Sequence, residues 1–294
     1  MPVSKRKTLP LALCILDKGY TRMDKITTTR GSFSFLKAFA PPLKPRTEGI
    51  TIASDRGISH DSTRSLIEVS ADVLDYIKTP DHYALMARYP ENWLRTKIAL
   101  YKKAEISPTL GGVIYEVAVV QGKVEAFMNR AADLGYAGIE VSEDVIEPQP
   151  PATRAAHIRY AKSLGLHVFT ELGRKFPDKP FDANEGVEIA HRDLESGASM
   201  IVVENSDIIR IVKEGGDGLH VLAERIPSEK LIFEAGPNER KPLLKWLIKE
   251  FGPSVNIENI EVQDAATVAA MRGGLHRNIG FSYFDRPRDQ PAGR

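Results

Sequence analysis

Short apolar runs that end in charged residues recur along this chain at a regular interval. The most pronounced is H-V-F-T-E-L-G-R-K at 167–175, in which Val168 and Phe169 belong in a core while Glu171 and Lys175 do not. Each run has the length of a buried β-strand, and the charge that follows marks the point where the chain leaves the core. The pattern predicts eight strands, at residues 50–54, 73–78, 106–110, 137–142, 167–172, 200–205, 230–235 and 255–260.

Longer stretches with helical character separate these strands. They lie at residues 92–104, 121–134, 151–164, 182–196, 210–215, 241–251 and 265–272. Gly135, Gly165 and Gly197 stand just after three of them, where helices commonly end in a left-handed residue. The interval from strand to strand is roughly 30 residues, the size of one βα unit. Alternating strands and helices predict a parallel sheet, and eight units can close it into a (β/α)8 TIM barrel.

We therefore predict an α/β fold with a single (β/α)8 barrel domain at 46–280, an N-terminal extension at 1–45 and a flexible tail at 281–294. An open, doubly wound sheet is the alternative, but no G-x-G-x-x-G follows the first strand. In the extension, a basic cluster at 5–7 precedes an apolar run at 9–16, which resembles a signal peptide. Because charged residues follow at 17–18 without a small-residue cleavage site, we favour a surface strand or helix.

Composition narrows the possible functions. Lys and Arg number 40 against 39 Asp and Glu, so the chain lacks the basic excess of a broad nucleic-acid or membrane surface. No apolar run approaches the roughly 18 residues that span a bilayer. The single cysteine, Cys14, excludes an internal disulfide framework and is typical of a reducing compartment, so we expect a cytoplasmic protein.

The barrel geometry gives the charged strand ends a chemical meaning, because barrel active sites lie at the carboxyl ends of the strands. The residues expected at that rim are Asp55, Lys78, Gly111, Gly112, Glu140, Ser142, Glu171, Glu204, Glu234 and Asn256. So many converging carboxylates require a compensating cation, or their pKa values must spread apart. A hard divalent ion such as Mg²⁺ suits an all-oxygen site. Lys78, Arg174 and Lys175 could then bind an anionic substrate. Solvated salt bridges are the structural alternative for these charges.

Several segments in order resemble the phosphosulfolactate synthase family, of which this chain looks like a diverged member. The likeness runs from about Pro45 to Gly274 and rests on P-R-T-E-G-I-T-I-A-S-D-R-G-I, G-G-V-I-Y-E-V-A-V-V-Q-G-K, G-I-E-V-S-E, T-E-L-G-R-K-F-P-D-K and L-I-F-E-A. The resemblance implies a barrel enzyme, of the carbon–sulfur lyase class, that adds sulfite to phosphoenolpyruvate with Mg²⁺ and forms 2-phospho-3-sulfolactate. It also implies a homo-oligomer.

The resemblance implies roles for individual residues. Lys175 falls at the position of the family's suggested acid, which protonates C2 after sulfite has attacked C3. Glu171, which we also count as catalytic, and Glu204 are the first candidates for metal ligation. Further metal candidates are Glu140, Glu234 and Asp55. Predicted substrate contacts are Arg46, Lys78, Gly111, Gly112, Arg174 and Ser142.

Several segments depart from the family's pattern, among them the glycine pair, which Leu110 and Val113 flank in place of a proline and a threonine. After Lys78, the chain reads T-P-D-H-Y at 79–83 in place of a glycine-tryptophan-glycine-threonine loop. Asn205 to Asp207 replace an arginine that follows Glu204, and the arginine-rich segment near the end becomes G-G-L-H-R-N-I at 273–279. Because lost arginines remove bidentate anion contacts, a diverged enzyme with another nucleophile or substrate is an alternative. A non-catalytic interaction protein is a third hypothesis, against which the retained charged rim argues.

Overall fold

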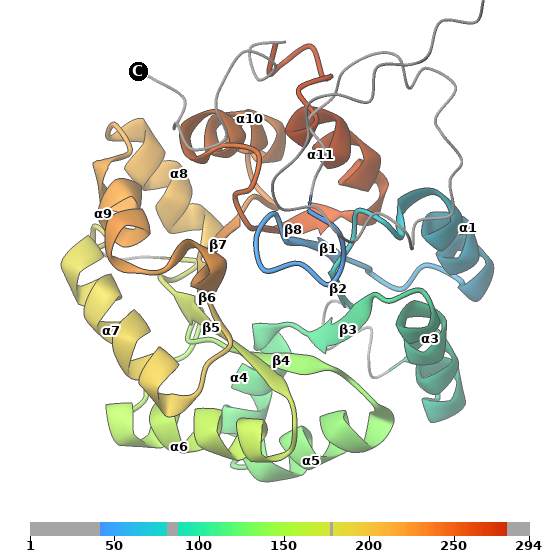
Figure 1. Ribbon diagram of the computed structural model, residues 1–294. Helices are drawn as coiled ribbons and strands as arrows, with labels where there is room; N and C mark the ends of the chain where they lie inside the picture. Colours follow the sequence, from blue (N-terminus) through green and yellow to red (C-terminus); the bar gives the residue numbers. More distant parts are fainter. Residues whose placement is uncertain (1–41, 81–87, 177–178, 281–294) are drawn as a thin grey trace, which may run out of the picture. The chain divides into compact units, whose positions relative to one another are not determined.

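Eight parallel strands close into a barrel in chain order, as the sequence predicts (Figure 1). The computed structural model describes residues 42–80, 88–176 and 179–280; the rest of the predicted extension, with Cys14, and the predicted tail lie outside the described residues. The strands are β1 Thr51–Ser54, β2 Tyr76–Lys78, β3 Ser107–Leu110, β4 Gly138–Val141, β5 His167–Leu172, β6 Met200–Val203, β7 Leu231–Glu234 and β8 Ile257–Glu261. Pairing of β1 with β8 completes the ring, so the fold is a (β/α)8 TIM barrel.

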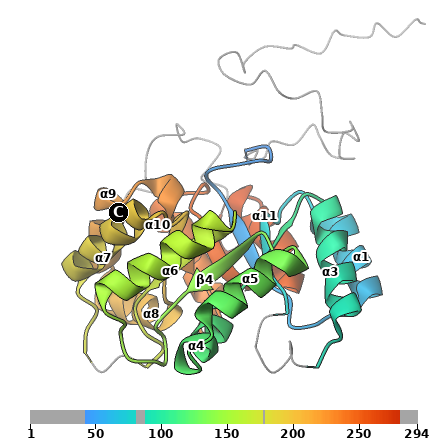
Figure 2. The ribbon, with the colours of Figure 1, turned by 90° about the horizontal axis from the view of Figure 1, so that it is seen from below.

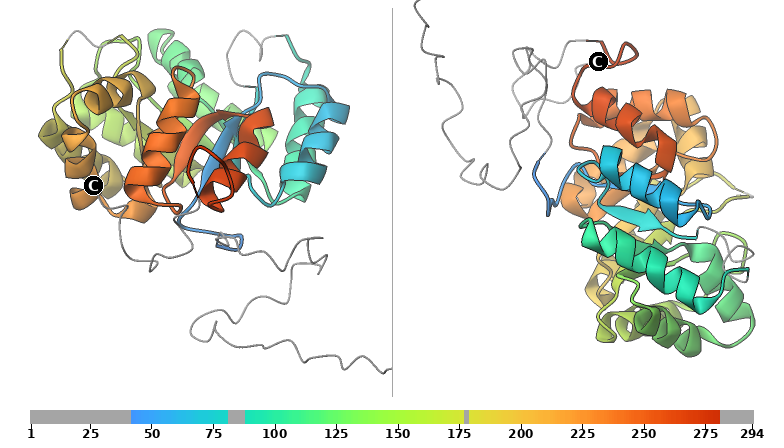
Figure 3. Two further views of the ribbon diagram at one scale, coloured as in Figure 1. Left: turned by 90° about the horizontal axis from the view of Figure 1, so that it is seen from above. Right: turned by 90° about the vertical axis from the view of Figure 1, so that its right-hand side faces the viewer.

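Helices surround the barrel (Figures 1 and 2). They are α1 His60–Ser70, α3 Glu91–Lys103, α4 Gly112–Val120, α5 Val124–Leu134, α6 Pro151–Ser163, α7 Ala183–Ser196, α8 Asn205–Lys213, α9 Asp217–Arg225, α10 Arg240–Phe251 and α11 Ala265–Arg272. Short 3₁₀ turns precede β7, at Ser228–Lys230, and α11, at Val262–Asp264. On the outside of β4, α5 packs against α6 (Figure 2). Elsewhere on the ring, α1 packs against α3 (Figure 3). No helix in the described ranges is long and apolar enough to cross a bilayer.

The structure differs from the predicted helices most clearly around α4. The sequence predicts one helix at 121–134, whereas two helices are present and a turn at Gly122, with a φ of 63°, separates them. The α4 sequence, G-V-I-Y-E-V-A-V-V, is apolar almost throughout and rich in β-branched residues. It therefore has no clear helical periodicity, and the structure buries only one side of it: Tyr115 and Ala118 are buried, whereas Val120 is 74% exposed.

Among the described residues, one apolar core lies between the strands and the helices and another lies inside the barrel. The inner core consists of Ile50, Ile52, Phe169, Met200, Val202 and Ile232, with Tyr76 packed against it. Side chains alternate between the two faces of a strand, so Lys78 lies on the same face as Tyr76, and Glu171 on the same face as Phe169. The interior is therefore apolar toward the amino ends of the strands and charged toward their carboxyl ends.

Candidate active site

Three carboxylates meet at the carboxyl end of the barrel. Asp144 comes from the β4–α6 loop, Glu171 from the end of β5, and Glu204 from the residue that precedes α8. Each offers one oxygen, these oxygens all lie within 4.8 Å of one another, and all three residues are buried. Neither Glu171 Oε1 nor Asp144 Oδ1 has a hydrogen-bond partner in the described structure. We call these residues the carboxylate group.

The surroundings of the carboxylate group shift its pKa values in opposite directions. Burial, followed by the charges of Asp144 and Glu140, raises the pKa of Glu171 well above its ordinary 4.5. Burial also raises the pKa of Asp144 to about 6, although the Lys175 ammonium opposes this shift. Burial acts on Glu204 in the same sense, but a hydrogen bond with Glu234 and the charge of Lys175 leave its pKa lowered.

A hard divalent cation fits the carboxylate group. Leaving buried carboxylate oxygens without partners is costly, and like charges at this spacing oppose full ionisation. Mg²⁺ takes oxygen ligands and often binds through one or two carboxylates together with substrate and water. The unpartnered oxygens of Glu171 and Asp144 are therefore suited to such an ion. Sequence analysis identified Glu171 and Glu204 but missed Asp144, although it directly follows the E-V-S-E run at the end of β4.

Lys175 lies beside the carboxylate group and pairs with the Asp144 carboxylate. Burial lowers the pKa of its ammonium group, but the charges of Glu171, Asp144, Glu204 and Glu234 outweigh this effect and raise the pKa above 10.5. The side chain is 34% exposed, so Lys175 is both charged and accessible from the cavity. A charged ammonium in this position can donate a proton to a bound molecule.

A second buried network connects Lys78 to the start of α4. The Lys78 ammonium group lies 2.8 Å from Glu140 Oε2 and 2.7 Å from Glu258 Oε1. The other oxygen of Glu140 accepts a hydrogen bond of 2.8 Å from the Gly112 backbone N–H. Glu140, a predicted metal ligand, therefore lies between a lysine and a helix N-terminus and outside the carboxylate group. Sequence analysis missed Glu258, which lies within β8 and could have been found from its polar character in a buried strand.

Glu234 also lies beside the carboxylate group rather than within it. Its Oε2 accepts a 3.0 Å hydrogen bond from the Asn205 backbone N–H, and its Oε1 accepts one from the Asn259 side chain. Burial, then the charge of Glu204, raises the pKa of Glu234 well above 4.5. The pKa values of Glu234 and Glu204 are therefore shifted in opposite directions.

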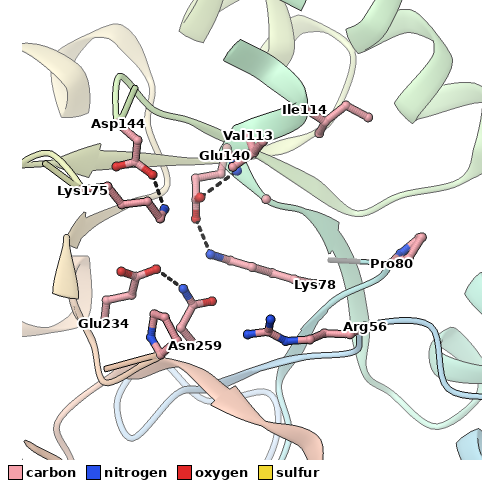
Figure 4. A pocket seen from close by; sticks show the side chains of 13 residues that line it. Arg56, Lys78, Pro80, Val113, Ile114, Glu140, Asp144, Lys175, Glu234 and Asn259 are labelled. Atoms are coloured by element: carbon pink, nitrogen blue, oxygen red, sulfur yellow. Dashed lines mark hydrogen bonds and ion pairs between the residues drawn. The ribbon is translucent and has the colours of Figure 1, made fainter. Parts of the chain in front are cut away.

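Asp144 of the carboxylate group lines a cavity together with residues from other strand ends (Figure 4). Lys175, Lys78 and Arg56 reach it from different strand ends, and the first turn of α4, Gly111 to Ile114, forms another wall. Glu140, Asp144 and Glu234 complete the charged lining, and Pro80, Pro237 and Asn259 also line the cavity. Backbone N–H groups at a helix N-terminus attract anions, as do nearby cations. The cavity can therefore receive a small anionic molecule next to the carboxylate group. Gly111 and Gly112 lie where the sequence predicts them.

Asp55, a predicted metal ligand, lies outside the carboxylate group. Its carboxylate is fully buried and lies 2.7 Å from the Lys97 ammonium. It also accepts hydrogen bonds from the Tyr101 and Thr79 hydroxyls, and from the N–H groups of residues 57 and 58. Donors from α3 and from the strand ends occupy both of its oxygens, so Asp55 is part of a structural ion pair.

Three predicted substrate contacts are also placed elsewhere. Arg46 pairs with Asp75 at 2.9 Å, and Asp75 accepts the N–H of Thr51, so Arg46 lies at the amino end of the barrel. Arg174 lines a second cavity between β5 and the helices, which Glu171 also lines, and donates to the Ile146 carbonyl at 3.1 Å. Ser142 donates its hydroxyl to Glu116.

The departures from the family's pattern affect the site unequally. The segment at 273–279 directly follows α11, whose last residue, Arg272, donates to the carbonyls of Pro253 and Val255 ahead of β8. This segment therefore lies toward the amino end of the barrel, away from the cavity. Asn205 instead ties α8 to the β7–α10 loop, through hydrogen bonds with Asn238. Only Thr79 and Pro80 of the changed loop belong to the described residues, and Pro80 lines the cavity.

Comparisons with known proteins agree with this geometry. A family model described as (2R)-phospho-3-sulfolactate synthase (ComA) matches residues 40–278. The chain is 30% identical over 255 residues to phosphosulfolactate synthase of Methanothermobacter thermautotrophicus, with 83% of this chain and 95% of the relative covered. It is 30% identical over 247 residues to phosphosulfolactate synthase of Bacillus subtilis, with 81% and 94% covered.

Among solved structures, DHDPS from Cyanidioschyzon merolae superposes with a TM-score of 0.52 at 12% identity, covering 81% of this chain and 78% of that one. At this identity the likeness concerns the barrel fold alone. The family match, by contrast, spans all eight described strands and the charged residues at their carboxyl ends. The chain belongs to the (2R)-phospho-3-sulfolactate synthase (ComA) family of enzymes.

Proposed function

We propose that this enzyme catalyses the Mg²⁺-dependent addition of sulfite to phosphoenolpyruvate, which yields 2-phospho-3-sulfolactate. The observation that carries the proposal is the carboxylate group with its unpartnered buried oxygens, directly beside the charged Lys175. Family membership and the anion-attracting cavity support it. Under this proposal the reaction is a carbon–sulfur bond formation and belongs to the lyase class.

Asp144, Glu171 and Glu204 are the residues that would hold the cation. When bound, Mg²⁺ supplies positive charge that stabilises negative charge developing on the substrate carboxylate. Asp55 is not part of this set, because its oxygens are already occupied.

The phosphate and carboxylate of phosphoenolpyruvate need positive partners in the cavity. The first turn of α4 offers backbone N–H groups, and Arg56 and Lys78 offer cationic side chains. Lys78 is held by Glu140 and Glu258, so its position is set before substrate arrives. A positioned cation lowers the entropic cost of orienting the substrate.

The chemical step forms one carbon–sulfur bond and transfers one proton. The sulfite sulfur attacks C3, the C3–S bond forms, and the π electrons of the C2–C3 double bond move toward C2 and the carboxylate. Lys175 then donates its proton to C2, and the product leaves with its phosphate ester intact. Pairing with Asp144 holds the Lys175 ammonium at the edge of the cavity until that transfer.

A diverged activity on the same site is the second candidate. The loop after Lys78 differs from the family's pattern and contributes Pro80 to the cavity wall. The nucleophile or the substrate could therefore differ while the carboxylate group and Lys175 keep their roles.

The test is phosphoenolpyruvate consumption by the purified enzyme with Mg²⁺, with and without sulfite. We expect sulfite-dependent consumption that falls by about 10²–10⁴-fold in Lys175→Ala, the usual contribution of a general acid. Lys179→Ala is the matched control, because that lysine follows in the same loop and its side chain is 80% exposed. Mg²⁺-dependent binding of phosphoenolpyruvate without turnover would favour the diverged activity. If the enzyme neither binds nor consumes phosphoenolpyruvate, the reaction with this substrate is contradicted under both candidates.

A further inference from the structure

Glu116 of α4 is a buried carboxylate that the proposed reaction does not use. It is 1% exposed and lies on the helix that lines the cavity with its first turn. Its Oε1 accepts hydrogen bonds from the Ser142 hydroxyl and, at 2.8 Å, from the Asp144 N–H, and its Oε2 accepts one of 3.1 Å from the Val145 N–H. Within the described part of the chain, every hydrogen bond to this carboxylate comes from the end of β4 and the loop that follows.

The contacts between α4 and β4 run in both directions. Glu140 on β4 accepts from the Gly112 N–H at the start of α4, and Glu116 on the next turn of α4 accepts from the loop after β4. The helix and the strand end approach so closely that a Cβ atom at Gly112 would overlap the Ser142 side chain. Only glycine fits at this contact, which fixes the distance between Glu116 and the loop.

Asp144 is the residue whose position depends on this arrangement. It lies in a loop without regular secondary structure, yet its carboxylate must reach both Glu171 and Lys175. Its backbone N–H is held by Glu116, and so is the N–H of the next residue. Hydrogen-bonded partners behind a metal ligand orient that ligand and are commonly worth 10–100-fold in metal affinity.

We propose that Glu116 is a positioning residue, which sets the Asp144 carboxylate for cation binding and for its contact with Lys175. The inference rests on the proposed function for the identity of the cation, but the hold on the Asp144 backbone is a property of the fold. Ser142 acts in the same arrangement, as a donor to Glu116 and not as a ligand of the substrate.

The experiment measures Mn²⁺ affinity of the full-length protein by electron paramagnetic resonance, with Mn²⁺ as the probe ion. Glu116→Gln keeps the size of the side chain but turns an N–H₂ group toward loop donors, so we expect affinity to fall by about 10–100-fold. Glu143→Gln is the matched control. Glu143 lies in the same loop but contacts Gln149 and Arg154 instead, so its variant should bind Mn²⁺ nearly as the wild type does.

A second comparison separates positioning from a general loss of stability. If Glu116 acts through Asp144, Glu116→Gln should cause no further loss of Mn²⁺ affinity in an Asp144→Asn background. Additive losses in the double variant would overturn the proposal, as would wild-type affinity in a folded Glu116→Gln protein.

Hydrogen exchange tests the hydrogen bonds from the loop to Glu116 directly, and it needs no metal. We expect the N–H groups of Asp144 and Val145 to exchange faster in Glu116→Gln than in the wild type, while strand amides of β4 keep their rates. Unchanged exchange at both positions would contradict the positioning role even if the wild type binds Mn²⁺. If the wild type binds no Mn²⁺, the proposed cation dependence fails, and the exchange rates still decide the role of Glu116.

Discussion

Asp55 and Glu171 look alike in the sequence and differ completely in the structure. Both lie at the carboxyl ends of barrel strands, and both are buried, with exposed fractions of 0% and 5%. Asp55 is surrounded by donors from α3 and the neighbouring strand ends. Glu171 Oε1 has no partner among the described residues, and its nearest charged neighbours include two further carboxylates.

The comparison shows that the donors around a buried carboxylate, and not its burial, separate structural from functional roles. A carboxylate whose oxygens are satisfied contributes to stability and has no capacity left for a ligand. A carboxylate without partners is costly for the fold and is retained where a ligand completes it. The comparison can be tested from both sides.

The largest expected effect follows from removing the partner of Asp55. Lys97→Met keeps an apolar stem but leaves the buried Asp55 carboxylate without its cation, which should cost about 3–5 kcal/mol of unfolding free energy. Urea denaturation measures this loss. Mn²⁺ affinity of the folded variant should stay unchanged. If the variant also lost Mn²⁺ affinity, Asp55 would belong to the cation site, and its distinction from Glu171 would be wrong.

A smaller effect is expected from the opposite change, Glu171→Gln. In the wild type, Mg²⁺ at 100 times its Kd should raise the unfolding free energy by about 2.7 kcal/mol, because the ion binds only the folded state. The variant should lose this stabilisation, and without Mg²⁺ it should be at least as stable as the wild type. Asp55→Asn serves as the control, and it should keep the Mg²⁺-dependent increment although its baseline stability is reduced.

The pH dependence of the unfolding free energy gives a further test of the carboxylate group. Burial raises the pKa of Asp144 from 3.8 to about 6, so between these values the folded protein binds more protons than the unfolded chain. Its contribution to the unfolding free energy therefore falls as the pH rises through this range, by about 2 kcal/mol in cation-free protein. Urea denaturation of the wild type and Asp144→Asn in EDTA measures the difference. An equal pH dependence in the two proteins would contradict the assigned environment of Asp144.

The smallest effect is expected at the other end of the barrel. Arg277 is exposed and lies in the changed segment after α11, on the side of the Arg272 contacts. Arg277→Ala should leave kcat/KM within about two-fold of the wild type. Substitutions of exposed residues away from a core or a binding site usually change the free energy by less than about 0.5 kcal/mol. A large rise in KM for phosphoenolpyruvate would show that this segment reaches the site.

The sequence by itself determined the barrel and the end at which its chemistry lies. Apolar runs of strand length, spaced by helices, specify a parallel ring, and the charge after each run identifies the carboxyl end. Glu171, Glu204 and Lys175 are correctly brought together by this reasoning, because the carboxyl ends of parallel strands meet at one rim of the barrel. The strand count and order also follow from local patterns.

Only the tertiary structure decided which charges are free to act. Asp55 is satisfied by Lys97 and Tyr101 from α3, and Arg46 is drawn to Asp75 at the opposite end of the barrel. Asp144 enters the site because Glu116 holds its loop from α4. These partners are far apart in the sequence, and hydrogen bonds act over about 3 Å, so no local pattern contains them. The periodicity of a chain specifies where a carboxylate lies, whereas the donors around it depend on how distant segments pack.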